Sequence, residues 1–333
     1  MTQSAPRYDV VAIGNAIVDV IARADEDFIV AQGMAKGSMQ LIDADQATSL
    51  YEAMGPGMEV SGGSAANTLA GMAALGSTCG FIGQVADDQL GAVFTHDIRA
   101  AGIDYTTPPQ KEGPPTARCL ILVTPDGQRT MNTFLGASHV LGAEMIDEAM
   151  IAGGAILYLE GYLWDPPQSR GAMRRAIEVA RKAGRKVAFT LSDTFVIDRH
   201  RDGFLTLIAD RQFDILFANE AEIISLQQTD DFEAAVAATA KDVPCLIVTR
   251  SEHGAIAIVD GARYEVAAEP IDKVVDTTGA GDLFAAGFLA GIGRGLDPQT
   301  SLVMGAVCAR EIISHVGPRA QTDIKAIVDQ RIG

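Results

Sequence analysis

The chain has 333 residues, 48% of them hydrophobic, and it carries a formal net charge of −17. Such a length and apolar content suffice for a large α/β core. The acidity argues against nucleic acid and anionic membranes as partners, so an anionic substrate would have to be held by local donors.

Cysteine and histidine usage points away from disulfides and metal centres. The four cysteines and five histidines are scattered along the chain without metal or redox spacing, which predicts reduced thiols and no His-ligated metal. No apolar run is long enough to span a membrane. The N-terminal stretch MTQSAPRYDVV lacks a charged segment followed by a long apolar run, so we expect no signal peptide and a cytoplasmic protein.

The first predicted element is a buried strand over residues 8–13, which continues in extended form over 15–21. Side chains alternate along a strand, so Asn15 and Asp19 share a face. A carboxylate can accept both hydroxyls of a vicinal diol, which makes Asp19 a candidate sugar ligand. The apolar neighbours favour this interpretation over an edge strand whose Asp19 faces water.

Residues 61–76 predict a helix that begins at a pair of glycines and ends at Gly76. Gly62 and Gly63 would present free backbone amides, and Asn67 lies in the first turns. These groups could bind a neutral polar ligand. A tight turn followed by a solvated Asn67 fits the same pattern equally well.

A strand over 81–85 and a helix over 92–101 follow, and then the pattern changes. Two alternating segments, 117–124 and 129–134, flank the sequence PDGQ, which predicts a β-hairpin. The hairpin interrupts the strand–helix rhythm, so we interpret it as a lid. Arg129 follows the turn, where the residues alone favour a solvated cation.

From residue 153 onward strands and helices alternate, which is typical of a parallel sheet buried on both faces. Strands are predicted over 155–159, 186–190, 213–218, 244–248 and 271–275. Polar or acidic residues follow most of these strands at their carboxyl ends. Open α/β sheets bind ligands beyond that edge, so the active site is expected there.

Two of these strand ends carry candidate nucleotide contacts. Asn219 and Glu222 begin a helix, where acids can simply offset the helix dipole. A carboxylate near phosphates can also hold magnesium through water, and we slightly favour this second role. Thr249 and Gly254 border a turn facing the same edge, where a plain turn is the stronger interpretation.

The chemistry centres on residues 274–288, VVDTTGAGDLFAAGF. Small residues at a helix N-terminus can hold a phosphate on free amides, here Gly279, Ala280 and Gly281. Asp282 would repel that phosphate, which suits a base that takes a proton from an attacking hydroxyl. The helix N-terminus is expected to keep its pKa low. A glycine turn whose Asp282 merely offsets the dipole is equally compatible.

Taken together, these motifs resemble the ribokinase-like (PfkB) carbohydrate kinases over nearly the whole chain. DTTGAGDLF at 276–284 is similar to the C-terminal signature of that family, the Gly62 to Asn67 stretch to its N-terminal signature, and NEAE at 219–222 to its magnesium-associated motif. Neither a Walker loop nor G-x-G-x-x-G after a strand is present. Within the family, EGYLWDPP at 160–167 and TLSDTF at 190–195 look most like adenosine kinases.

The resemblance implies a role for each matching residue. Asp282 would be the catalytic base, the residues at 279–281 the anion hole, and Arg129 a lid cation that neutralises charge. Ribose contacts would come from Asn15, Asp19, Gly62, Gly63 and Asn67. Contacts to ATP and Mg²⁺ would come from Asn219, Glu222, Thr249, Gly254 and Thr278.

Two further implications are less specific. Some relatives bind a monovalent cation such as K⁺ beside the anion hole, here near Asp276 and Thr278. The base pocket is expected to need an aromatic stack, for which Phe134, Leu163, Tyr162 and Trp164 are the candidates.

We therefore predict a single domain with a three-layer α/β/α sandwich, a mostly parallel central sheet, and a small β-sheet lid from segments near 15–45 and 116–138. The predicted reaction is ATP-dependent phosphorylation of the 5′-hydroxyl of adenosine by a monomer or homodimer. One alternative is a kinase of the same family acting on fructose, ribose or a related sugar. Another is a nucleoside-binding protein without catalysis.

Overall fold

Buried apolar strands build the large central sheet, and the computed structural model describes residues 5–333. The first four residues of the stretch expected to lack a signal peptide lie outside this range. Within it, no helix combines the length and apolar character that crossing a membrane requires. The four cysteines are free, as expected, and three of them are buried.

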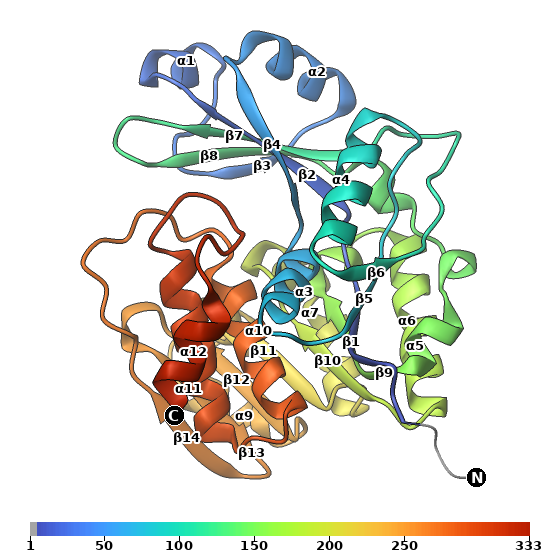
Figure 1. Ribbon diagram of the computed structural model, residues 1–333, viewed down its shortest axis with the longest axis vertical. Helices are drawn as coiled ribbons and strands as arrows, with labels where there is room; N and C mark the ends of the chain where they lie inside the picture. The colour runs from blue at the N-terminus through green and yellow to red at the C-terminus, as the bar shows by residue number, and fades with distance from the viewer. Residues whose placement is uncertain (1–4) are drawn as a thin grey trace.

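The large sheet has nine strands, and the strands from β12 to β6 run parallel (Figure 1). In spatial order they are β14 (Ala262–Val266), β13 (Ala255–Val259), β12 (Cys245–Thr249), β11 (Ile215–Asn219), β10 (Lys186–Thr190), β9 (Gly154–Glu160), β1 (Tyr8–Ile13), β5 (Cys79–Ile82) and β6 (Ile103–Tyr105). The β13–β14 hairpin extends one edge antiparallel. The carboxyl ends of the parallel strands therefore meet at one edge, which positions the site.

Helices cover both faces of this sheet and complete the predicted three layers. Alternate strand residues feed two separate hydrophobic clusters, because neighbouring side chains of a strand point to opposite faces. One cluster joins the sheet to α3 (Ser64–Ala74), α4 (Gln89–Ala100), α10 (Ala280–Gly293), α11 (Pro298–Ile312) and α12 (Ile324–Ile332). The other joins it to α5 (Glu148–Gly153), α6 (Pro167–Lys182), α7 (Thr194–Ala209), α8 (Glu220–Gln227) and α9 (Phe232–Ala240).

A second sheet of five strands lies above the carboxyl ends of the large one in Figure 1. Its order is β3 (Met39–Leu41), β8 (Arg129–Phe134), β7 (Ala117–Val123), β2 (Ile17–Arg23) and β4 (Gly57–Gly62). Its outer face carries α1 (Glu26–Ala31) and α2 (Ala44–Ala53). The β7–β8 pair is the predicted hairpin, and β2 lies between β4 and β7 rather than at an edge.

Short 3-10 helices complete the described elements and lie in the connections. They are η1 (Gly136–Val140), η2 (Ala143–Met145), η3 (Gly161–Trp164) and η4 (Ser251–His253). Of these, η3 follows β9 directly at the carboxyl edge of the sheet, and η4 forms the turn between β12 and β13.

Three sequence-based expectations about elements need correction. Residues 271–275 are not a strand; they are irregular, because the β13–β14 hairpin already occupies that edge of the sheet. The strand expected over 81–85 is β5, which ends at Ile82. The second sheet also contains β4, outside the predicted lid segments. Its Gly-flanked, half-exposed sequence gave no clear alternating signal.

Candidate active site

The glycine loop ends in a helix N-terminus that opens onto a cavity. Gly279 is the N-cap of α10 and has a φ of 79°, a left-handed conformation that glycine adopts readily. A Cβ on Gly281 would have no atom within 4 Å. In residues 5–333 the amides of Gly281 and Asp282 donate no hydrogen bond. The loop can therefore accept an anion on free backbone donors.

Asp282 lies where the N-termini of α3 and α10 meet. These helices approach closely because α3 carries Gly71, where a Cβ would lie 2.5 Å from Leu283 Cδ1. Ser64 Oγ donates to Asp282 Oδ1 over 2.6 Å, and Asn67 Nδ2 donates to Oδ2 over 3.1 Å. Two side chains that lie more than 200 residues before Asp282 in the sequence therefore orient its carboxylate.

The expected low pKa of Asp282 is wrong. Burial raises the pKa of this carboxyl above its usual range, although the hydrogen bonds from Ser64 and Asn67 and the charge of Arg319 oppose the shift. Desolvation outweighs the helix N-terminus here because it acts on the whole charge of a buried group. A raised pKa makes Asp282 a stronger base once it is ionised.

Asp19 and its neighbours form a second polar group in the same cavity. The Asp19 side chain is buried on β2, which rules out the water-facing edge strand. Gly62 leaves it room, since a Cβ there would lie 2.4 Å from Asp19 Oδ2. The amide oxygens Asn15 Oδ1 and Asn67 Oδ1 are buried without a hydrogen-bond partner in the described chain. These acceptors point to a ligand that supplies hydroxyl donors.

Arg129 connects the second sheet to the glycine loop. Its guanidinium forms an ion pair with Asp276 and donates to Thr278 Oγ1 over 3.1 Å. The side chain is 8% exposed, so the solvated cation favoured by the residues alone is wrong. Asp276 also accepts from the amides of Thr278 and Gly317. A monovalent cation at this carboxylate would have to compete with Arg129.

Asn219 and Glu222 form a reciprocal capping box at the start of α8. The Asn219 side chain accepts from the Glu222 amide, and the Glu222 carboxylate accepts from the Asn219 amide. Both residues also line the cavity. Burial raises the pKa of Glu222 to about 7. The pair therefore stabilises the helix and presents a carboxyl group to the cavity, so the two interpretations offered by the sequence are compatible.

These residues surround one cavity of about 1,020 Å³ between the two sheets. Of the predicted site residues, it is lined by Asn15, Asp19, Gly63, Asn67, Asn219, Glu222, Thr249, Gly254, Thr278, Gly279, Ala280, Gly281 and Asp282. Gly62, Arg129 and Asp276 do not line it themselves, although each contacts or crowds a lining residue.

The expected base-pocket residues Phe134 and Leu163 do not line the cavity. Leu163 is fully buried in the cluster beneath α6 and α7. Phe134 alternates with Thr133, which does face the cavity. Of the other two candidates, Tyr162 lines the cavity and Trp164 does not. Tyr162 forms an aromatic wall with Phe195, and their ring centroids are 6.2 Å apart.

Sequence reasoning missed two charged residues at this site. Glu160 is fully buried, accepts from the amides of Asn15 and Ala65 and from Asn15 Nδ2, and has its pKa raised to about 7 by burial. Arg319 donates to the carbonyl oxygens of Ser61 and Ala66. Glu160 ends a predicted strand, which was a usable signal. Arg319 lies in an irregular segment that carries no pattern.

The free energy of unfolding should increase as the pH is lowered from about 8 towards about 5. Burial raises the pKa values of Asp19, Glu160 and Glu222 to about 7, whereas in an unfolded chain they are about 4. The folded state binds more protons between these values, so its stability is lost as pH rises through this window. Urea unfolding over this pH range measures the slope.

Glu160→Gln is the matched comparison, because it removes one titrating group from the buried set. The variant should show a smaller rise in stability on acidification than the wild type. Equal slopes in the two proteins, or a wild-type maximum at the alkaline end, would contradict the buried-carboxyl assignment.

Comparisons with known proteins agree with this geometry. The pfkB family carbohydrate kinase model matches residues 9–325. The adenosine kinase from Sinorhizobium meliloti has a crystal structure that is 47% identical, with a TM-score of 0.92, covering 98% of this chain and 99% of that one. A protein described as a probable sugar kinase from Rhizobium etli CFN 42 is 47% identical with a TM-score of 0.93 and the same coverage.

A more distant relative has a different activity. The fructokinase of Escherichia coli is 30% identical over 235 residues, which is 69% of this chain and 76% of that protein. The family model spans nearly the whole chain, and the glycine loop and buried carboxylates lie in one cavity. The chain belongs to the pfkB family of carbohydrate kinases.

Proposed function

We propose that this protein is an adenosine kinase, which transfers the γ-phosphoryl group of ATP to the 5′-hydroxyl of adenosine and releases ADP and AMP. The observation that carries the choice of acceptor is an apolar wall beside the candidate diol site. The 47% identity to the Sinorhizobium meliloti adenosine kinase supports the same acceptor.

The apolar wall comes from both halves of the cavity. Ile121, Met131 and Leu135 line it from the second sheet, and Tyr162 and Phe195 line it from the main body. A nucleobase is a flat, largely apolar body that can be buried against such side chains. A free sugar would leave this wall in contact with water, so the wall favours a nucleoside.

The polar residues would then bind different hydroxyl groups of the acceptor. Asp19 would accept the two ribose hydroxyls, and the free oxygens of Asn15 and Asn67 could accept others. This arrangement would hold the 5′-hydroxyl near Asp282, which takes its proton late in the transfer. The Ser64 and Asn67 hydrogen bonds keep the Asp282 carboxylate oriented towards the cavity.

The phosphoryl group would be stabilised at the glycine loop. The free amides of Gly281 and Asp282 could bind its oxygens while charge develops. Arg129 is already within hydrogen-bond reach of Thr278 on the same loop. If Arg129 left Asp276 and paired with the transferring phosphate, it would neutralise the charge of that phosphate. It would also hold the second sheet over the acceptor, which excludes water.

The donor side would hold ATP and Mg²⁺. Thr249 and Gly254 line the cavity beyond the glycine loop and leave space for the nucleotide. Mg²⁺ would supply positive charge to offset that of the phosphates. The Glu222 carboxyl, oriented by Asn219 at the cavity wall, fits a contact to that ion through water. A K⁺ ion near Asp276 would require Arg129 to leave this carboxylate.

A sugar acceptor is favoured by two findings, the likeness to the Escherichia coli fructokinase and the likeness to the probable sugar kinase from Rhizobium etli CFN 42. The test is ADP release measured with adenosine, other nucleosides, fructose and ribose under identical conditions. Adenosine should exceed the free sugars in kcat/KM by about 100-fold or more, because base burial contributes about 3 kcal/mol. A free sugar that matches adenosine would contradict the proposed acceptor, and nucleoside binding without ADP release would indicate a non-catalytic protein.

A further inference from the structure

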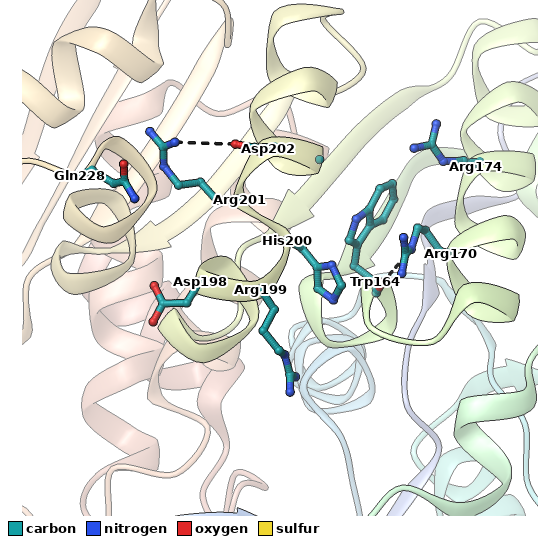
Figure 2. A pocket seen from close by; sticks show the side chains of 10 residues that line it. Trp164, Arg170, Arg174, Asp198, Arg199, His200, Arg201, Asp202 and Gln228 are labelled. Atoms are coloured by element: carbon teal, nitrogen blue, oxygen red, sulfur yellow. Dashed lines mark hydrogen bonds and ion pairs between the residues drawn. The ribbon is translucent and has the colours of Figure 1, made fainter.

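A second cavity of about 410 Å³ lies between α6 and α7 (Figure 2). Its wall includes Trp164 from η3, Arg170 and Arg174 from α6, and Arg199 and Arg201 from α7. In Figure 2 the Trp164 indole lies between the arginines of α6 and His200 of α7. Trp164, a candidate for the base stack, does not line the large cavity, and the proposed function uses neither Trp164 nor the α6 arginines.

The charge of this cavity is opposite to that of the whole protein. Four arginines line it against two acids, Asp198 and Asp202, whereas the chain carries a net charge of −17. Neither acid blocks the cavity. Asp202 has a fully exposed side chain 3.8 Å from Arg201, and Asp198 accepts from Ser225 Oγ on α8. Arg199 pairs with Asp165 and Arg201 with Asp202, so Arg170 and Arg174 are the cavity arginines without an acidic partner in the described chain.

Two donors in this wall lack a partner in the part of the chain described here. Arg174 has no hydrogen bond or ion pair there, and its guanidinium lies 5.1 Å from the centre of the Trp164 ring. The Trp164 side chain is 2% exposed, and its Nε1–H, which donates no hydrogen bond within residues 5–333, is open to the cavity. Gly203 keeps the space beside this nitrogen open, since a Cβ there would lie 3.1 Å from Nε1. Both donors are therefore available to an acceptor that enters the cavity.

We propose that this cavity is a regulatory site for a small phosphate ester, bound by Arg174 and the Trp164 indole. Guanidinium groups match phosphate oxygens in geometry and charge. A volume of about 410 Å³ lies in the range of cavities that hold small organic ligands, so there is room for a sugar-sized group beside the phosphate. Inorganic phosphate shares the recognised chemistry but would fill only part of the space.

Asp165 connects this site to the acceptor cavity. Its carboxylate accepts from Arg199 over 3.0 Å and lies 2.7 Å from His200 Nε2. Asp165 and Arg199 also line the large cavity, and the Arg199 guanidinium lies 4.6 Å from the Phe195 ring centre. A bound phosphate would compete with Asp165 for Arg199 and His200.

The helix that carries these groups contains a kink. α7 departs from helical geometry at His200, where φ is −127° and ψ is 16°. The turn before this kink holds Phe195, which forms part of the wall proposed for the nucleobase. Ligand binding at Trp164 would therefore change nucleoside affinity, and by linkage the nucleoside would change ligand affinity equally. This coupling rests on the proposed function, whereas binding at the cavity does not.

The binding test uses fluorescence, because Trp164 is the sole tryptophan of the chain. Ribose 5-phosphate is titrated into the full-length protein without ATP, beside separate titrations with inorganic phosphate and with sodium chloride at matched ionic strength. A saturable change in emission with ribose 5-phosphate supports the site. A response that follows ionic strength alone overturns it, and tighter binding of inorganic phosphate than of the ester overturns the assigned ligand class.

Two neighbouring arginines give a matched pair of variants. Arg174→Gln should weaken the ester at least about tenfold, as expected for loss of a charged hydrogen bond. Arg175→Gln should leave binding unchanged, because Arg175 faces Glu148 and Glu178 outside the cavity. Equal affinities in the two variants would place the ligand elsewhere, including the large cavity, and overturn the proposal.

The coupling test measures the nucleoside dissociation constant by calorimetry with and without saturating ribose 5-phosphate. The wild type should show a change of about fivefold or more, and Arg174→Gln should show none. Binding of the ester without any effect on nucleoside affinity would overturn the regulatory role while leaving the site. Calorimetry needs no turnover, so absence of kinase activity would count against the proposed function and not against this coupling.

Discussion

Asp282→Asn should lower kcat by about 10²- to 10⁴-fold, the usual contribution of a positioned general base. The amide has nearly the same shape and can still accept the Ser64 hydrogen bond. It cannot accept the proton of the acceptor hydroxyl. Because Asp19, rather than Asp282, is assigned to the ribose hydroxyls, KM for adenosine should change little. Steady-state ADP release gives both parameters.

Ser64→Ala is the control for this variant. It removes the 2.6 Å hydrogen bond to Asp282 and leaves the carboxylate in place. Its kcat should fall far less than that of Asp282→Asn. If Asp282→Asn keeps wild-type turnover, or if both variants lose the same activity, Asp282 is not the base and the carboxylate serves only to orient α3 against α10.

The sequence predicted the framework because the framework depends on local patterns. Continuous apolar runs separated by helical periodicity define parallel strands, and the polar residues after each run lie at the same edge. Asp282 and Asn67 could be assigned to this edge from separate motifs. Their mutual contact could not be predicted, since it depends on Gly71 allowing α3 and α10 to approach closely.

The structure around the wrongly predicted residues depends on long-range packing, which leaves no pattern in the local sequence. Val274 and Val275 look like a buried strand, yet they are 50% and 37% exposed on an irregular segment. Arg129 resembles a surface hairpin cation, and only the approach of the second sheet to the glycine loop buries it against Asp276. Burial likewise sets the pKa of Asp282, which the helix N-terminus alone would lower.

Arg319→Met should destabilise the folded protein by about 3–5 kcal/mol, the usual cost of removing one partner from a buried group of charges. Arg319 is partly buried and donates to the carbonyl oxygens of Ser61 and Ala66. Its positive charge also lowers the pKa values of Asp19 and Asp282, against the effect of burial. Methionine leaves both carbonyls unpaired and both carboxyls uncompensated. Urea unfolding measures the loss directly.

Arg263→Met supplies the surface comparison, since Arg263 pairs with Glu233 and Glu265 near solvent and should contribute less than about 1 kcal/mol. The electrostatic role of Arg319 has its own readout. Without its charge the pKa values of Asp19 and Asp282 rise, so the acid limb of kcat/KM should move to higher pH. Arg319→Lys keeps the charge and should restore the limb even where stability stays low. An unchanged pH profile in Arg319→Met would restrict Arg319 to a packing role, because a charge that stabilises two ionised carboxylates cannot be removed without shifting their titration.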